Sequence, residues 1–183
     1  MNVHSEEMVR DAAMFAAGAH AGQKYGKDEK PYHYHLQATV NVLHRFLPKD
    51  TFFVFFADIY ASAWLHDTLE DTKVTHEDLR NYFGANVADI VDAVMDARRP
   101  NRRERHLATY PFIREHGGDS AVLVKLADRI ANVEYSIGTA DAGKIQMYRK
   151  EWQDFQTLIG RTAGTSKTEK KMWAHLDGLM EEP

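Results

Sequence analysis

Apolar side chains recur at helical intervals along most of the chain, and this periodicity limits the folds that the chain can adopt. Met8, Ala12, Phe15 and Ala19 follow one another at steps of three and four residues, which places them in one stripe of an amphipathic helix. Similar stripes continue to the C-terminus, interrupted by only five prolines and eleven glycines. No alternating run is flanked by hairpin turns, so nothing favours strands. The sequence therefore predicts an all-α fold, as one compact domain over residues 1–183.

Capping and helix-breaking residues divide this pattern into segments. Pro48 ends one helix, and Thr51 is a suitable N-cap for the next. Thr75, followed three residues later by Asp78, resembles a capping box, and Gly84 ends the short helix that it opens. We expect loops at 22–31 and 98–105, and helices at 8–19, 36–47, 51–70, 75–83, 87–97, 107–115, 120–137, 142–159 and 167–180.

Composition excludes several classes of protein. With 183 residues, 44% of them hydrophobic, the chain is long enough to bury a core without staples. Its net charge of −4 argues against a surface that binds nucleic acid or an anionic membrane. The most apolar stretch, 52–65, contains Asp58 and is shorter than the roughly 20 residues that span a bilayer. The acidic N-terminus is unlike a signal peptide. We therefore expect a cytoplasmic protein with no nucleic-acid and no membrane partner, of an oligomeric state that the sequence leaves open.

The chain contains ten histidines and no cysteine. Disulfides, thiolate metal sites and a cysteine nucleophile are therefore excluded. Any metal site must be built from histidine, carboxylate and water.

Histidine and carboxylates are concentrated between residues 63 and 72. His66 and Asp67 are adjacent near the predicted end of a helix, where an imidazole nitrogen and a carboxylate oxygen can face one divalent ion. Glu70 lies four residues after His66 and therefore returns to the same face, and Asp71 has the same spacing from Asp67. Burying these charges without a cation would be costly. A bare His-Asp pair is also consistent with a surface pair, but the added carboxylates at helical spacing favour a functional site.

A second candidate segment is the apolar stretch 122–133, which contains Asp128. A carboxylate in so apolar a helix needs a partner. Asn132 lies one turn further on the same face. An ordinary salt bridge from Asp128 to Arg129 or to a distant arginine is an equally good explanation, and Arg129 is itself expected to pair with an acidic side chain.

The third segment, Pro31-Tyr32-His33-Tyr34-His35, precedes a predicted helix, and either histidine is a candidate ligand. Together the segments resemble the HD-domain phosphohydrolases, and among them the RelA/SpoT-type guanosine polyphosphate (ppGpp) hydrolases and their small stand-alone relatives. That branch has the motifs A-H-x-G-Q, P-Y-x-x-H, L-H-D-x-x-E-D-T and K-L-A-D-R-x-x-N. In the same order, this chain has Ala19–Gln23, Pro31–His35, Leu65–Thr72 and Lys125–Asn132. The resemblance covers about residues 10–135.

The resemblance implies an HD-domain helical bundle with a metal site drawn from three stretches of chain. By position in the motifs, the ligands of a single Mn²⁺ are His35, His66, Asp67 and Asp128. The P-Y-x-x-H spacing matches His35 rather than His33. Two nitrogens and two carboxylate oxygens suit Mn²⁺, Fe²⁺ or Zn²⁺, so the ligand types do not rank these metals. Helices at 142–180 are expected to complete the core.

The resemblance also implies a reaction. In the family, the pair found here as Glu70 and Asp71 marks removal of the 3′-pyrophosphate of (p)ppGpp, which yields GDP or GTP and pyrophosphate. We expect these catalytic carboxylates to position and deprotonate a water or to protonate the leaving group, in roles that the sequence does not distinguish. The metal ion would lower the pKa of its bound water. The chain ends where a RelA/SpoT synthetase would begin, so we expect no synthetase activity.

The predicted substrate contacts include one departure from the family. An arginine that lies against the guanine base usually follows A-H-x-G-Q, whereas this chain has Lys24-Tyr25. The ring of Tyr25 can stack on a base, and Lys24 or Lys27 can replace the missing positive charge. Lys125 and Asn132, both in the last motif, are further candidate contacts. Arg129 of the same motif is a candidate phosphate contact as well, although pairing with an acidic side chain is favoured for it.

Five arginines lie between residues 98 and 105. They are consistent with a solvated loop beside acidic neighbours, or with a rim that attracts a polyanionic nucleotide. The family places a basic loop at this point, and we therefore predict that Arg103 and Arg105 contact substrate.

Two alternative functions stay open. The first is another HD-domain nucleotide phosphatase, acting on deoxynucleoside monophosphates or NADPH. The second is a regulator that binds a nucleotide without turning it over. Aromatic residues at helical spacing in the C-terminal helices are expected in the core rather than in a binding site: Tyr148, Trp152, Phe155 and Trp173.

Overall fold

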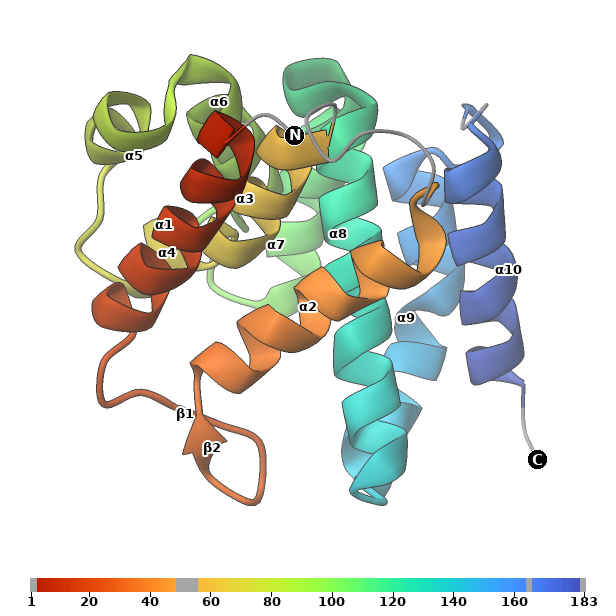
Figure 1. The fold of residues 1–183 in the computed structure, drawn as a ribbon. Helices are drawn as coiled ribbons and strands as arrows, with labels where there is room; N and C mark the ends of the chain where they lie inside the picture. The colour runs from red at the N-terminus through yellow and green to blue at the C-terminus, as the bar shows by residue number, and fades with distance from the viewer. Residues whose placement is uncertain (1–2, 49–55, 164–165, 182–183) are drawn as a thin grey trace.

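The computed structural model describes residues 3–48, 56–163 and 166–181, and it is helical almost throughout (Figure 1). Two single-turn 3₁₀ segments, η2 (Tyr110–Phe112) and η3 (Arg161–Ala163), join longer helices. The α-helices are α1 (Val3–Ala19), α2 (His33–Phe46), α3 (Ala57–Leu65), α4 (Thr68–Asp71), α5 (His76–Phe83), α6 (Ala85–Val94), α7 (Arg102–Thr109), α8 (Ile113–Gly138), α9 (Ala142–Ile159) and α10 (Lys167–Met180). The all-α prediction is confirmed.

The longest helix, α8, lies at the centre of the packing. In Figure 1, α2 crosses in front of it, α9 and α10 lie on one side, and α1, α3, α5 and α6 lie on the other. Val122, Leu126 and Ile130 recur every four residues on α8 and are fully buried, because this face meets neighbours on several sides. Phe155 and Trp173 join the same hydrophobic cluster, as expected from the sequence. Burial of this face fixes the helix that carries Asp128.

The helix expected over 51–70 is broken in the structure. Its predicted cap, Thr51, lies outside the described residues, and α3 ends at Leu65. His66 and Asp67 form a turn before the single-turn helix α4. Both residues keep helical backbone angles, so the spacing argument for Glu70 holds approximately although the helix is interrupted.

Two other predicted boundaries were wrong. Helix α7 begins inside the expected loop 98–105, where the side chain of Asn101 caps it by accepting the Glu104 N–H. Arginine and glutamate are good helix formers, so a charged run does not exclude a helix. The expected helix over 107–115 is divided between α7 and α8, and α8 continues across a kink at Gly118 (φ 63°). The predicted capping box of Thr75 is confirmed.

The expected loop over 22–31 contains a small hairpin. Strands β1 (Lys24–Tyr25) and β2 (Lys30–Pro31) pair antiparallel, over too few residues to leave an alternating pattern in the sequence. Gly26 has a φ of +73°, and a Cβ there would collide with the ring and hydroxyl of Tyr135 on α8. The hairpin tip therefore packs directly on α8, which fixes the position of Tyr25.

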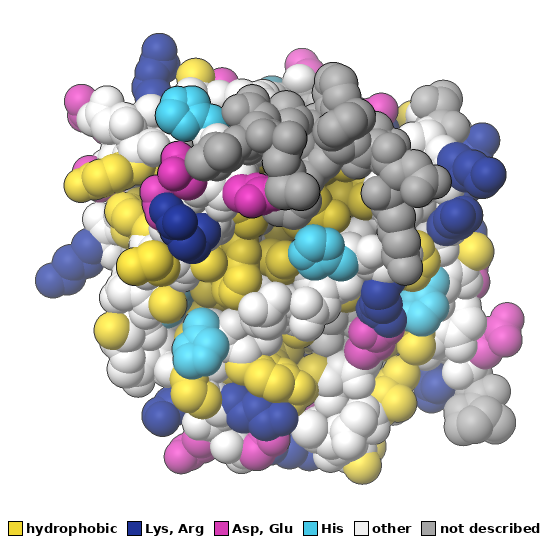
Figure 2. Space-filling view, viewed as in Figure 1, with side chains coloured by type: hydrophobic (Ala, Val, Ile, Leu, Met, Phe, Trp, Pro, Cys, Tyr) yellow, Lys and Arg dark blue, Asp and Glu magenta, His cyan; other side chains and the backbone are white. Residues whose placement is uncertain are grey.

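The surface carries charges of both signs. On the face drawn in Figure 2, hydrophobic side chains gather in a central band with acidic, basic and histidine side chains scattered around it. Within the part of the chain that the structure describes, no helix is both long enough and apolar enough to cross a bilayer.

Candidate metal centre and catalytic site

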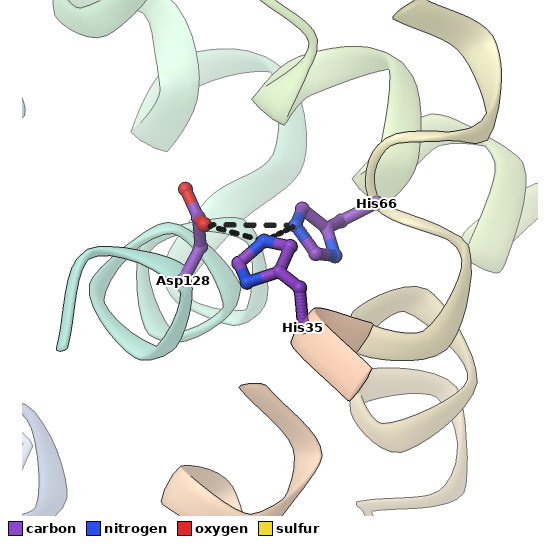
Figure 3. A group of neighbouring side chains, drawn as sticks. All are labelled: His35, His66 and Asp128. Atoms are coloured by element: carbon purple, nitrogen blue, oxygen red, sulfur yellow. Dashed lines mark hydrogen bonds and ion pairs between the residues drawn. The ribbon is translucent and has the colours of Figure 1, made fainter. Parts of the chain in front are cut away.

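Three side chains from distant parts of the chain converge on one point (Figure 3). His35 lies in the first turn of α2, His66 follows α3, and Asp128 lies in the middle of α8. The Nε2 atoms of the two histidines are 3.2 Å apart. Asp128 Oδ1 lies 3.2 Å from Nε2 of His35 and 3.6 Å from Nε2 of His66. These spacings match those of ligand atoms around a single ion.

Asp67 adds a fourth oxygen beside this group. Its Oδ2 lies 3.1 Å from His66 Nε2 and 3.5 Å from His35 Nε2. The structure therefore brings together all four of the predicted ligands, with Asp67 contacting both histidines. His33, the alternative to His35, has an exposed side chain.

The chemistry of these four side chains fits a divalent metal ion. His66 Nδ1 lies 2.9 Å from the carbonyl oxygen of Ala63 and donates its proton there, which leaves the Nε2 lone pair facing the centre. Burial would raise the pKa of Asp128, but its close contacts with the imidazole rings of His35 and His66 hold that pKa well below its usual range. The carboxylates are therefore ionised, and a cation between them would offset their buried charge.

The carboxylates of Glu70 and Asp71 lie next to this centre. Glu70 Oε2 accepts the backbone N–H of Asp96 at 3.0 Å. The Tyr32 hydroxyl lies 2.7 Å from Asp67 Oδ2 and 3.1 Å from Asp71 Oδ2, so both carboxylates share its proton. Burial raises the pKa of Glu70 and of Asp71, and the negative charge of Asp67 adds to the shift. Carboxylates of raised pKa are suited to proton transfer.

Gln23, the last residue of the first sequence motif, also contacts Asp71. Gln23 Nε2 donates to the backbone oxygen of Asp71 at 2.8 Å. His20 is buried, stacks on Tyr32 with ring centroids 4.5 Å apart, and contacts the Gln23 side-chain oxygen through Nδ1 at 2.8 Å. The motif itself was the available signal for these roles, but neither His20 nor Gln23 was among the predicted site residues.

A polar cavity of about 200 Å³, here called the catalytic cavity, opens onto these groups. The predicted residues that line it are His35, Asp67, Glu70, Asp71, Tyr25, Lys125, Asp128 and Asn132. Arg129, which was also considered as a phosphate contact, lines the cavity too, and the further lining residues, which the sequence did not place there, are Tyr32, Asp96, Arg102, Tyr110, Lys144 and Tyr148.

Two of these further lining residues, Tyr148 and Arg102, belong to groups that the sequence had singled out for other roles. Tyr148 was expected only in the core, and it is indeed buried, yet its edge forms part of the cavity wall. Arg102 belongs to the arginine cluster, in which Arg103 and Arg105 were preferred. Helical periodicity cannot distinguish a buried ring that faces the core from one that faces a cavity, since both lie on the same face.

Three cations of the catalytic cavity, Arg102, Arg129 and Lys125, are paired with carboxylates of the protein. Arg102 Nε donates to Glu151 at 2.7 Å, and Arg129 contacts the same carboxylate at 3.2 Å, as expected for Arg129. Lys125 is buried, where its ammonium donates to Asp96 Oδ1 at 3.2 Å. Burial would lower the pKa of Lys125, but the charge of Asp96 more than offsets this and raises it.

Tyr25 is connected to the metal ligands in two ways. Its ring stacks on that of His35, with centroids 4.7 Å apart and an interplanar angle of 15°. Its hydroxyl donates to Asn132 Oδ1 at 2.9 Å, and Asn132 Nδ2 donates to Asp128 Oδ1 at 2.5 Å. Tyr135 contacts the ring as well, with centroids 4.7 Å apart. Tyr25 therefore contacts the candidate ligand His35 directly and the candidate ligand Asp128 through Asn132.

Some predicted contacts lie outside the catalytic cavity. Lys24 is exposed on β1, and Lys27 pairs with Asp141 at 3.4 Å. Arg103 is 79% exposed at its side chain and reaches Asp154 at 3.9 Å. The structure does not bring these three cations to the site.

Arg105 lines a second cavity, here called the arginine cavity. Its volume is about 290 Å³, and it shares Glu70, Asp71 and Asp96 with the catalytic cavity. Its remaining wall is formed by Met95, Arg98, Arg99 and Arg105.

Comparison with known proteins agrees with this geometry. The chain matches the HD domain family over residues 12–165. It is 34% identical over 135 residues to guanosine-3′,5′-bis(diphosphate) 3′-pyrophosphohydrolase MESH1 of Danio rerio, covering 73% of this chain and 71% of that one. It is also 34% identical over 170 residues to a Vibrio cholerae protein named guanosine-3′,5′-bis(diphosphate) 3′-pyrophosphohydrolase, covering 86% of this chain but 22% of that longer protein.

A solved structure has the same fold. It is a metazoan ortholog of SpoT, described as hydrolysing ppGpp, and it matches with a TM-score of 0.72 at 23% identity, covering 94% of this chain and 93% of that one. At this identity the match establishes the shared fold.

Helices that gather histidine and aspartate ligands around one point define a class of metal-binding helical domains. This chain belongs to the HD-domain family, and its resemblance to the guanosine polyphosphate hydrolase branch is confirmed by the relatives that it matches. The HD domain binds a divalent metal, and His35, His66 and Asp128 are the group through which this chain can do so.

Proposed function

We propose that the chain hydrolyses (p)ppGpp at the 3′-pyrophosphate, giving GDP or GTP and pyrophosphate. The observation that carries this proposal is the placement of Glu70 and Asp71 beside the His35–His66–Asp128 group in one polar cavity. The relatives named for the same reaction support it. We further propose Mn²⁺ as the metal, with His35, His66, Asp67 and Asp128 as its ligands.

A bound divalent ion would polarise the phosphoryl group and lower the pKa of a water. The protein residues then have separate tasks. We assign proton abstraction from the water to Asp71. The Tyr32 hydroxyl contacts both Asp71 and the proposed ligand Asp67, and this shared contact places the Asp71 carboxylate beside the metal site. Glu70, anchored by the Asp96 N–H, is left to protonate the departing 3′-oxygen.

The cationic wall of the catalytic cavity suits a polyphosphate. Arg102, Arg129 and Lys144 line the cavity across from the carboxylates, together with the buried Lys125. Guanidinium and ammonium groups bind phosphate oxygens by charge-assisted hydrogen bonds. Lys125 and Asn132 remain predicted substrate contacts, and Tyr25 is proposed to act on the site through His35 and Asn132 as well as on the base.

We also propose that residues 1–183 fold as one domain that acts in the cytoplasm on a small-molecule nucleotide, without nucleic-acid or membrane partners. Packing of helices from both ends of the chain around α8 supports the first point. The net charge of −4 supports the last.

The experiment that tests this function is a panel of nucleotide mono-, di- and polyphosphates incubated with the Mn²⁺-loaded protein. Released phosphorus species are identified by ³¹P NMR. We expect pyrophosphate and GDP from ppGpp. Release of orthophosphate from NADPH or from deoxynucleoside monophosphates, with ppGpp left intact, would favour the alternative phosphatase. Binding of ppGpp without release of any phosphorus species would favour the regulator.

A further inference from the structure

The arginine cavity lies directly behind the catalytic carboxylates. Glu70 and Asp71 line both cavities, so a group held in the arginine cavity lies next to the catalytic pair. Arg98 and Arg99 follow α6, whereas Arg105 extends from α7. Two separate elements therefore direct positive charge to the same space.

These arginines differ from those of the catalytic cavity in their partners. Within the described ranges, no carboxylate lies within 4.0 Å of the guanidinium groups of Arg98, Arg99 or Arg105, whereas Arg102 and Arg129 both pair with Glu151. Arg99 donates to a backbone oxygen, that of Arg98, at 2.9 Å. The Nε atom of Arg105 is buried and has no hydrogen-bond partner in the described part of the chain. A buried donor without a partner is rare in a folded protein, and the side chain that carries this one lines the arginine cavity.

The arginines and the size of the cavity together indicate the class of ligand. Three carboxylates also line the cavity, so its net charge does not select an anion, but its three arginines are free of acidic partners among the described residues, and guanidinium groups bind phosphate oxygens in a bidentate manner. The cavity, at about 290 Å³, has room for a phosphate group. Its ligand must also reach the catalytic pair, since the two cavities share that wall.

We propose that the arginine cavity binds the terminal phosphate of the 3′-pyrophosphate group, and the pyrophosphate product after cleavage. This inference rests on the proposed function. In that reaction the water oxygen bonds to the phosphorus attached to O3′, the P–O3′ bond breaks, and O3′ takes up a proton. The terminal phosphate forms and loses no bond, so Arg98, Arg99 and Arg105 can hold it from substrate to product.

The test compares two ligands and two double variants of equal charge. Arg98→Ala/Arg99→Ala removes two charges from the cavity, and Arg10→Ala/Arg80→Ala removes two exposed arginines from α1 and α5. Binding of pyrophosphate and of GDP is measured by calorimetry on metal-loaded protein, with free metal removed because pyrophosphate binds it. Circular dichroism and thermal melting check that each variant is folded.

In Arg98→Ala/Arg99→Ala we expect the Kd for pyrophosphate to rise about 10- to 100-fold, because up to two charge-assisted contacts are lost. We expect the Kd for GDP to change by less than about threefold in this variant. In Arg10→Ala/Arg80→Ala, we expect the Kd for pyrophosphate and the Kd for GDP each to change by less than about threefold. Three results would overturn the inference: unchanged pyrophosphate binding, an equal loss for GDP, or an equal loss in the control variant.

The same measurements separate this inference from the proposed function. Binding of pyrophosphate needs no turnover. If the arginine variant loses pyrophosphate binding and the wild-type protein does not cleave ppGpp, only the proposed function fails. If wild-type protein cleaves ppGpp and the variant binds pyrophosphate normally, only the arginine cavity proposal fails.

Discussion

The catalytic cavity and the arginine cavity share a wall but use their cations differently. In the catalytic cavity, Arg102 and Arg129 are held by Glu151, and Lys125 is held by Asp96. In the arginine cavity, none of the lining guanidinium groups has a carboxylate within 4.0 Å among the described residues. Paired cations are fixed in place and shape a site, whereas unpaired cations can bind an incoming anion. A positively charged side chain beside a site therefore indicates anion binding only once it is known whether a carboxylate of the protein pairs with it.

The largest expected effect comes from removing the carboxylate that α8 contributes to the centre. Asp128→Ala should lower turnover of ppGpp by more than the roughly 10- to 100-fold that loss of an outer metal partner costs. Metal content, measured by atomic emission, should fall with it, while helix content stays close to that of wild type. Glu115→Ala, an exposed change on the same helix, is the control. Full turnover in Asp128→Ala would show that the centre lies elsewhere.

Breaking a paired cation should cost folding stability. Lys125→Met leaves Asp96 without its ammonium partner in a buried setting, and should lower the free energy of unfolding by about 3 kcal/mol. Urea denaturation of the two proteins measures this difference. The double variant Lys125→Met/Asp96→Asn should recover part of the loss, since no uncompensated charge remains. A single variant as stable as wild type would mean that the pair contributes nothing to the fold.

The fixed charges around the catalytic cavity should also produce a pH dependence. Burial, followed by the charge of Arg102, lowers the pKa of His106 to about 4. The unfolded chain protonates this residue near its ordinary pKa of about 6.5, so its contribution to stability is complete above pH 6.5 and is lost as the pH falls towards 4. We expect a loss of about 1–2 kcal/mol over this interval, allowing for partial screening by solvent.

His106→Phe is the matched variant for this measurement, because a ring at position 106 can keep the stack on Tyr110, whose centroid lies 4.3 Å away. Unfolding free energies of wild type and variant are compared at pH 7 and pH 4.5, which cancels the titration of carboxylates common to both. The difference between them should change with pH. A constant difference would show that His106 titrates normally in the folded state.

The smallest effect is expected at Tyr25. Tyr25→Phe keeps the ring on His35 and removes the hydrogen bond to Asn132, so metal affinity should fall by less than about tenfold. Tyr25→Arg restores the residue that the family usually has, and should raise the ratio of guanosine to adenosine polyphosphate turnover. Metal titration and paired kinetics measure the two effects. An unchanged ratio would show that this position does not contact the base.

The sequence predicted the helical class from local spacing, and the motifs of the resembled family selected four candidate ligands that the structure brings together. Helical periodicity marks α8 and the burial of Leu126, and the motifs place His35, His66 and Asp128 before any coordinates are known. The structure adds that these residues, far apart in the chain, meet within a few ångströms.

The sequence was least informative about the direction in which each arginine side chain points. Arg102, Arg103 and Arg105 lie within four positions of one another, yet they reach the catalytic cavity, the surface and the arginine cavity, respectively. On one helix Arg103 points about 100° away from Arg102 and about 160° away from Arg105, whereas Arg102 and Arg105 are about 60° apart, and only the tertiary packing decides what each direction meets. The same reason explains why Glu151, the partner that holds Arg102, could not be identified from spacing alone.

The collision that Gly26 avoids with Tyr135 has a consequence for how this chain can vary. Saturation mutagenesis should find a glycine-only position at the tip of an otherwise permissive, solvent-exposed hairpin, since any larger residue must lift the tip off α8. Lifting it would draw Tyr25 away from His35. Substitutions at this exposed turn are therefore limited by the need to keep Tyr25 stacked on the buried His35.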